Sequence, residues 1–109
     1  MRLSRLDAKL LKIEPDRSMR PVSPLAEAQG ILFLCPKCFA SAGNSIGVHS
    51  VICWFKNRGV PDDMTPLPGR WNPSGTGIED LTFVEPGAVS VLLTSGCCWH
   101  GFVKNGDAT

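Results

Sequence analysis

Two short motifs of the 109-residue sequence carry side chains that can bind a metal ion. Cys35 and Cys38 are separated by two residues, and far along the chain Cys97 and His100 repeat this spacing. With such spacing, two side chains from one tight turn can reach the same tetrahedral ion. Two motifs of this kind complete a Cys3His ligand set, which is typical of structural zinc sites. The sequence therefore predicts one zinc ion held by these four residues.

Either of two neighbouring cysteines could be the ligand in the second motif, because Cys98 directly follows Cys97. Pairing His100 with Cys97 keeps the two-residue gap, whereas Cys98 would give a tighter spacing. We favour Cys97 as the ligand, with Cys98 as a spare ligand or a packed side chain. A disulfide between the two neighbours is disfavoured because it would be strained.

His49 and Cys53 are further candidate ligands. Residues 48–55 are rich in β-branched and aromatic side chains and predict a strand, on which His49 and Cys53 would share one face. They could complete a second site or add a ligand to the main one. A buried cysteine beside a hydrogen-bonded histidine is the more ordinary interpretation.

Two kinds of chemistry fit the cysteine motifs less well. A Cys-Pro-x-Cys dithiol is catalytic where it opens a helix that lowers the pKa of a thiol, but a turn at 42–44 followed by a strand is expected here. A catalytic zinc needs an open coordination position and a nearby general base. Four ligands leave no position open, and the acidic residues lie in no recognisable motif. We therefore predict no enzymatic activity, with a metal-dependent hydrolase kept as an alternative.

Composition limits the remaining classes of function. Apolar residues make up 43% of the chain, which indicates a folded domain, while 9 prolines and 11 glycines indicate many turns. The net charge of +1 gives no extended basic surface for nucleic acid and no basic patch for a membrane. No apolar run is long enough to span a bilayer, and no secretory signal follows Met1. Reduced cysteines in an intracellular, cytoplasmic protein are the resulting expectation.

The order of elements predicts a mainly β, small α+β domain resembling a zinc ribbon. Segments 31–34, 48–55, 81–84, 89–93 and 99–104 are strand-like. One short helix is expected over 23–30, with Ser23 as N-cap, Pro24 at the first position and Gly30 at the end. Residues 56–80 form a long Pro/Gly-rich loop whose middle we expect Trp71 to anchor. Residues 1–22 are assigned to an N-terminal strand or arm, 23–106 to the zinc-stabilised domain and 107–109 to a tail.

Beyond residue 25, most of the sequence resembles a group of small uncharacterised proteins of tailed bacteriophages and prophages, which share a domain of unknown function. The resemblance lies in residues 28–38, 49–55, 69–71, 81–82 and 96–106. In that group the second motif commonly reads Cys-Gly-Trp-His, so Cys98 stands where glycine is common, and the resemblance supports Cys97 and His100 as ligands. It implies a phage origin and metal binding, and it carries no established activity.

These observations lead to a prediction of function. We expect a small zinc-binding phage protein that is a non-enzymatic accessory or virion-associated protein and acts through contacts with a phage or host protein. Its expected location is the host cytoplasm or the virion. A regulatory module that binds nucleic acid or a host factor is the main alternative.

Overall fold

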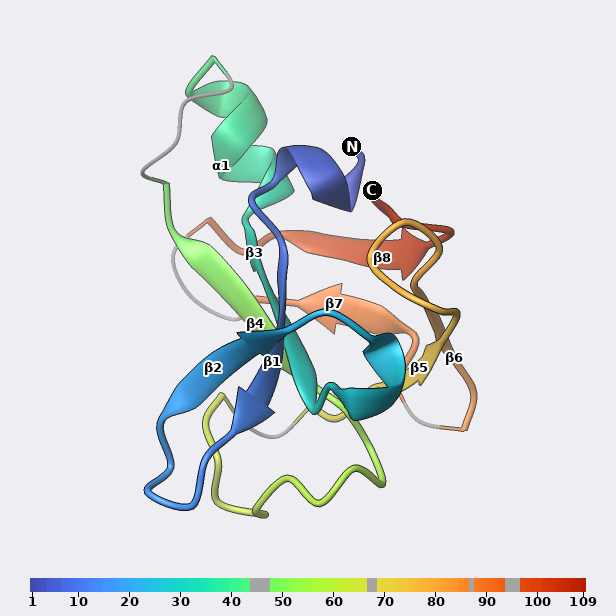
Figure 1. Cartoon of the computed structure of the whole chain (residues 1–109). Helices are drawn as coiled ribbons and strands as arrows, with labels where there is room; N and C mark the ends of the chain where they lie inside the picture. The colour runs from blue at the N-terminus through green and yellow to red at the C-terminus, as the bar shows by residue number, and fades with distance from the viewer. Residues whose placement is uncertain (44–47, 67–68, 87, 94–96) are drawn as a thin grey trace.

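The computed structural model of the chain describes residues 1–43, 48–66, 69–86, 88–93 and 97–109. It confirms the prediction of a mainly β domain, with a single α-helix among the described residues (Figure 1). The elements occur in the order η1 (Leu3–Arg5), β1 (Lys9–Ile13), β2 (Met19–Val22), η2 (Leu25–Glu27), β3 (Gly30–Leu34), α1 (Pro36–Ser41), β4 (Ser50–Trp54), β5 (Asn72–Ser74), β6 (Thr82–Val84), β7 (Ser90–Leu92), β8 (His100–Lys104) and β9 (Asp107–Ala108), where η denotes a short 3-10 helix.

The largest sheet has the strand order β2-β1-β3-β4, and every neighbouring pair is antiparallel. β3 lies inside this sheet and is buried along almost its whole length, which explains its continuous apolar sequence. Ile31 and Phe33 belong to the main hydrophobic core. Leu11, Trp54 and Met64 form a second, smaller cluster. The sheet therefore has apolar contacts on both faces.

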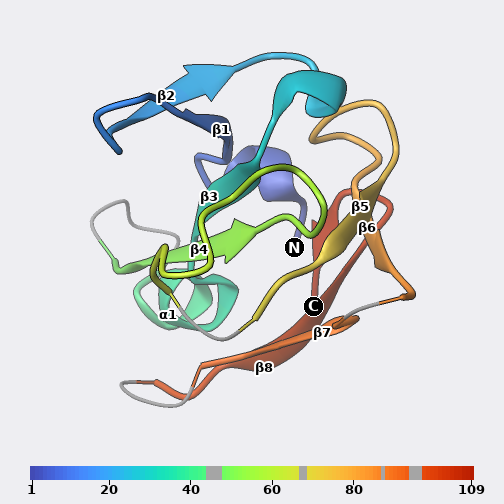
Figure 2. The same ribbon diagram turned by 90° about the horizontal axis from the view of Figure 1, so that it is seen from below.

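A three-stranded sheet, β7-β8-β9, packs against the same main core, and β5 and β6 form a separate two-stranded pair. Figure 2 shows β7 and β8 on the opposite side of the molecule from β2. Val91 and Val103 are buried in the core, and the ring of Trp99 meets that of Phe33 edge to face at 6.0 Å. This contact fixes the start of β8 against β3.

The helix expected over 23–30 is not present in that form. Only Leu25–Glu27 adopts a 3-10 turn, and Gly30 begins β3 instead of ending a helix. The reason is a close approach between strands, because a Cβ on Gly30 would lie 2.5 Å from Cε3 of Trp54 on β4. Gly30 is thus required for sheet packing, and pairing with β1 and β4 outweighs the local helix signals.

The α-helix of the structure instead lies at Pro36–Ser41, where we expected a metal-binding turn. Pro36 suits the first turn of a helix, since its missing N–H would have no partner there in any case. The two end segments that the sequence analysis separates from the central domain, 1–22 and 107–109, also contribute strands to the fold. The 1–22 segment supplies β1 and β2 to the large sheet, and Asp107–Ala108 pairs with β8.

Trp71 anchors the 56–80 loop, as expected. Its ring stacks on Phe83 with a centroid distance of 5.7 Å, and its Nε1 donates to the carbonyl of Ser90 at 2.9 Å. Its backbone N–H donates to the carbonyl of Trp54 at 3.1 Å. Trp71 consequently joins the end of β4 to the start of β7, two elements that line the same core.

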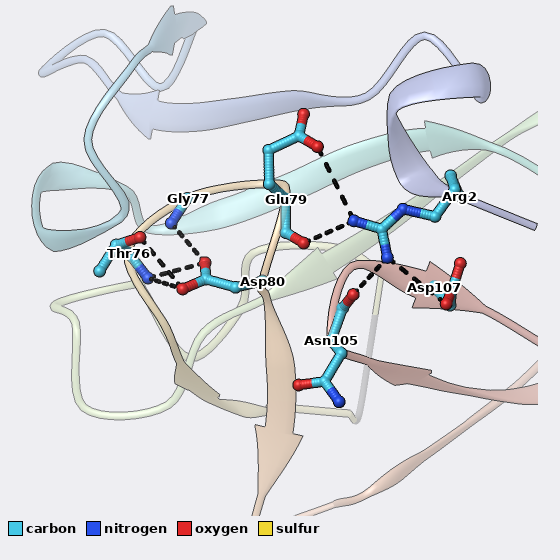
Figure 3. A network of polar contacts seen from close by, with 7 residues as sticks. All are labelled: Arg2, Thr76, Gly77, Glu79, Asp80, Asn105 and Asp107. Carbon is cyan, nitrogen blue, oxygen red and sulfur yellow. Dashed lines mark hydrogen bonds and ion pairs between the residues drawn. The ribbon is translucent and has the colours of Figure 1, made fainter.

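The two ends of the chain are fastened by Arg2 (Figure 3). Its guanidinium donates to the backbone carbonyls of Asn105 and Glu79, and it forms an ion pair with Asp107 at 3.4 Å. The N-terminal ammonium of Met1 donates to the carbonyl of Ala108 at 2.8 Å. The planar guanidinium, with several donors in fixed directions, is suited to bridging two carbonyls in this way.

Arg2→Ala is expected to lower the free energy of unfolding by about 1–2 kcal/mol, because charge-assisted hydrogen bonds to two carbonyls are lost from a partly exposed site. Arg2→Lys should recover only part of this loss, since one ammonium cannot reproduce the fork of donors. Urea denaturation of the three proteins measures the effect. Equal stability of the alanine variant and the parent would show that the Arg2 contacts contribute nothing.

Candidate metal centre

Four side chains converge at one end of the large sheet: Cys35, Cys38, His49 and Cys97. Each offers one ligand atom, and these four atoms all lie within 4.8 Å of one another. The Sγ atoms of Cys35 and Cys97 are 3.5 Å apart, and Nε2 of His49 is 3.3 Å from Sγ of Cys97. Ideal tetrahedral zinc would separate two sulfurs by about 3.8 Å and a sulfur from a nitrogen by about 3.6 Å. The group therefore needs only small adjustments to surround a metal ion.

The first two ligands are positioned by the junction of β3 and α1. Cys35 is the N-cap of the helix and fully buried, and its carbonyl accepts the N–H of Phe39 at 2.9 Å. Cys38 follows within the first turn of α1 and is half-buried. A helical turn brings residues three apart onto one face, so the CxxC spacing directs both sulfurs to the same point.

His49 is placed by the pairing of β3 with β4. In that register Leu34 lies opposite Ser50, so the residues just beyond them, Cys35 and His49, meet at the end of the sheet. The backbone N–H of Cys35 donates to the carbonyl of His49 at 3.0 Å, which extends the ladder to the ligands themselves. The His49 side chain is exposed, so the centre lies at the surface of the molecule.

Cys97 comes from the connection between β7 and β8. The N–H of Leu93 donates to the carbonyl of Trp99 at 2.8 Å and closes this connection. Nζ of Lys37 donates to the carbonyl of Cys97 at 2.9 Å. This last bond joins the two cysteine motifs directly and brings a positive charge beside a group of thiols. The ligands thus come from three separate segments, and not from the two short motifs alone.

His100, the fourth ligand predicted from the sequence, lies outside this group. It is the first residue of β8, its side chain is exposed, and its ring lies 6.1 Å from that of Phe102 on the outer face of the sheet. The alternation of a strand explains this position, because Trp99 is buried against Phe33 and the next side chain must point away. His49, which we kept as an additional candidate, takes the place assigned to His100.

The other two candidates also lie outside the group. Cys98 is exposed and has a backbone φ of +54°, in the left-handed region. Cys53 is fully buried in the main core, and burial raises the pKa of its thiol. Cys53 therefore packs as a small apolar side chain, which is the ordinary interpretation of a buried cysteine. His49 lies just before the first residue of β4, and its exposed side chain belongs to the ligand group, not to the core that contains Cys53.

Cys98→Gly is expected to preserve metal binding and to raise the free energy of unfolding slightly, by less than about 1 kcal/mol. Glycine adopts the left-handed conformation without the strain that a Cβ imposes, and its greater freedom in the unfolded chain offsets part of this gain. Metal content and urea denaturation test the variant together. Loss of metal would identify Cys98 as a ligand.

The thiols of the centre differ in acidity. Burial raises the pKa of Cys97, but hydrogen bonds from His49, from the backbone of Trp99 and from its neighbouring thiols outweigh this and lower it to about 6. The pKa of Cys38 is raised to about 11, chiefly by its hydrogen bond with Cys97. Without a metal, the raised pKa of Cys38 keeps the proton on its thiol at neutral pH. A bound cation would displace this proton and stabilise the thiolates.

A catalytic dithiol lies at the start of a helix, and the sequence predicts a turn at this point. The structure has a helix after Cys35, so the absence of a helix is no argument against a redox dithiol. The remainder of the site distinguishes the two interpretations. A redox dithiol needs only Cys35 and Cys38, whereas the structure adds a third sulfur and an imidazole, with all four ligand atoms within 4.8 Å of one another. The complete group matches a metal site better than a dithiol.

Comparisons with protein-family models, with curated proteins and with solved structures found no match for this chain. No helix among the described residues is long and apolar enough to cross a bilayer. The class of protein is therefore defined by the fold and the site alone. The chain is a small, mainly β protein with a Cys3His group that is close enough together to hold a metal ion.

Proposed function

We propose that the chain is a zinc-binding protein in which Cys35, Cys38, His49 and Cys97 hold one structural zinc ion. The observation that carries this proposal is the convergence of four ligand atoms from three segments within 4.8 Å. Three thiolates and one imidazole are soft to intermediate ligands, which favour zinc over magnesium or calcium. Because the four protein ligands fill a tetrahedral sphere, no position is left for the water that a hydrolase would need.

The ion would reinforce contacts that already connect these elements, among them the edge-to-face contact of Trp99 with Phe33 and the hydrogen bond from Lys37 to the carbonyl of Cys97. It would join the β3–α1 junction and the start of β4 to the β7–β8 connection, and so close one end of the core. Such a cross-link would add to the stability of a small domain with many loops. We assign the zinc a role in holding the fold and not in chemistry.

The zinc proposal is tested by metal analysis of the full chain purified without added metal or chelator. We expect one equivalent of zinc. Substitution with cobalt(II) should give the visible absorption of a tetrahedral ion together with sulfur-to-cobalt charge-transfer bands. A metal-free protein that does not take up zinc, or a six-coordinate cobalt spectrum, would contradict the proposal.

For the biological role we propose a non-enzymatic accessory protein of phage origin that binds a phage or host protein, in the host cytoplasm or on the virion. The support is an exposed apolar pair on the outer face of β7 and β8, where Leu92 is 58% and Phe102 50% exposed. Exposed apolar side chains on neighbouring strands are common at protein interfaces. The near-neutral charge of the chain favours a protein partner over nucleic acid.

This role is tested by mass spectrometry of purified particles and by co-purification from infected cells. Phe102→Asp should abolish association with the particle or with a defined partner, because a charge is then placed in the contact. Met19→Asp is the matched control, since Met19 is 47% exposed but lies on β2, away from this face. Equal loss in both variants, or no association in either protein, would count against the proposed surface.

A further inference from the structure

The metal centre contains a pair of sulfurs that can replace the metal as a cross-link. Sγ of Cys35 and Sγ of Cys97 are 3.5 Å apart, and these residues are separated by 62 positions in the sequence. A disulfide between them would join the β3–α1 junction to the β7–β8 connection, the same segments that the proposed zinc joins. This inference rests on the proposed zinc centre.

Contacts outside the ligand atoms keep this pair together when no metal is bound. The backbone of Cys35 is held by its N–H bond to the carbonyl of His49 and by the N–H of Phe39. The backbone of Cys97 is held by Lys37, whose ammonium donates to its carbonyl at 2.9 Å. Because these bonds do not involve sulfur, loss of the ion leaves the two cysteines facing each other.

Burial decides the order of events. Cys97 and Cys38 are half-buried, whereas Cys35 is fully buried, so an oxidant in solution reaches Cys97 before Cys35. A bridge from Cys35 to Cys38 would close a loop within one turn of α1 and would not join the two segments. A bridge from Cys35 to Cys97 closes a long loop and restricts the unfolded chain far more.

We propose that the centre is a redox switch in which a small-molecule disulfide, such as oxidised glutathione, exchanges the bound zinc for a Cys35–Cys97 disulfide. The Cys97 thiolate attacks the oxidant and forms a mixed disulfide, releasing one thiolate. The Cys35 thiolate then attacks Sγ of Cys97 and displaces the second thiolate. Two electrons pass from the two cysteines to the oxidant, both released thiolates take protons from water, and Zn²⁺ leaves Cys38 and His49.

The consequence of this exchange is a protein that remains folded while it releases its metal. Reduction of the disulfide restores the two thiolates and the zinc site. The reduced, chelated protein has neither cross-link, so it is the least stable of the three states.

The experiment treats the zinc-loaded full chain, in the Cys98→Ser background, with oxidised glutathione. Released zinc is followed with a chromogenic chelator, and remaining thiols are alkylated before peptide mapping. We expect one zinc released for each Cys35–Cys97 disulfide formed, with Cys38 and Cys53 alkylated. The Cys98→Ser change keeps the mapping of Cys97 unambiguous, and dithiothreitol followed by zinc should restore the starting state.

Two results overturn the inference while leaving the zinc proposal intact. One is a zinc-loaded protein whose oxidation gives a Cys35–Cys38 link or only mixed disulfides. The other is an oxidised, zinc-free protein that unfolds at the same urea concentration as the reduced, chelated one. A protein that contains no zinc at the outset and does not bind it overturns both proposals, so the two failures are distinguishable.

Discussion

Cys35→Ser is expected to abolish stoichiometric zinc binding and to make unfolding insensitive to zinc. A serine hydroxyl does not ionise near neutral pH and is a poor ligand for zinc, whereas Cys35 is the fully buried member of the group and joins β3 to α1. Structural zinc contributes about 10–16 kcal/mol of binding free energy in small zinc peptides, and this contribution depends on the complete set of ligands. The serine hydroxyl is also left buried at the N-cap.

The measurement is urea denaturation of parent and variant, each with one equivalent of zinc and with excess chelator. The parent should show a large difference between the two conditions, and Cys35→Ser should show almost none. Cys98→Ser is the matched control, because it makes the same chemical change at an exposed residue outside the group. If both serine variants keep one equivalent of zinc, the ligands are assigned incorrectly.

The sequence predicts β3, β4, β6, β7 and β8, because their signals are local, but it places β5 in the 56–80 loop and β9 in the 107–109 tail. The apolar run of β3, the β-branched and aromatic residues of β4 and the alternating pattern of β8 each depend on a few neighbouring side chains. The helix was misplaced because local signals compete with tertiary packing. Ser23, Pro24 and Gly30 are residue types that commonly begin and end helices. Gly30 is instead needed on β3, because the ring of Trp54 on β4 leaves no room for a Cβ there.

The candidate site shows the same limit. Cys35 and Cys38 are recognisable from their spacing, since one turn brings them together. Cys97 and His49 depend on how strands pair in space, and only the register of β3 with β4 places His49 beside Cys35. The available signal was the position of His49 at the start of a strong strand segment. By contrast, the spacing of Cys97 and His100 suggests a shared ligand role, but His100 lies on β8 outside the group of converging ligand atoms.

The choice between the two histidines gives the second large prediction. His49→Ala is expected to weaken zinc binding by roughly a hundredfold, because it removes one of four ligands and leaves water to complete the coordination sphere. The cobalt(II) form should shift its visible bands accordingly, while its sulfur-to-cobalt transitions remain. Competition with a chromogenic chelator measures the affinity.

His100→Ala is the matched control, since it removes an exposed imidazole from the outer face of β8, outside the ligand group. Its zinc affinity should equal that of the parent within experimental error. The two substitutions delete the same side chain and differ only in position, so general effects of losing an imidazole cancel in the comparison. The reverse pattern, with His100→Ala weakening zinc and His49→Ala leaving it unchanged, would mean that the ion binds the Cys97–His100 motif. In that case the start of β8 would have to turn its outer face toward Cys35 when the metal binds, against the burial of Trp99 that now fixes it.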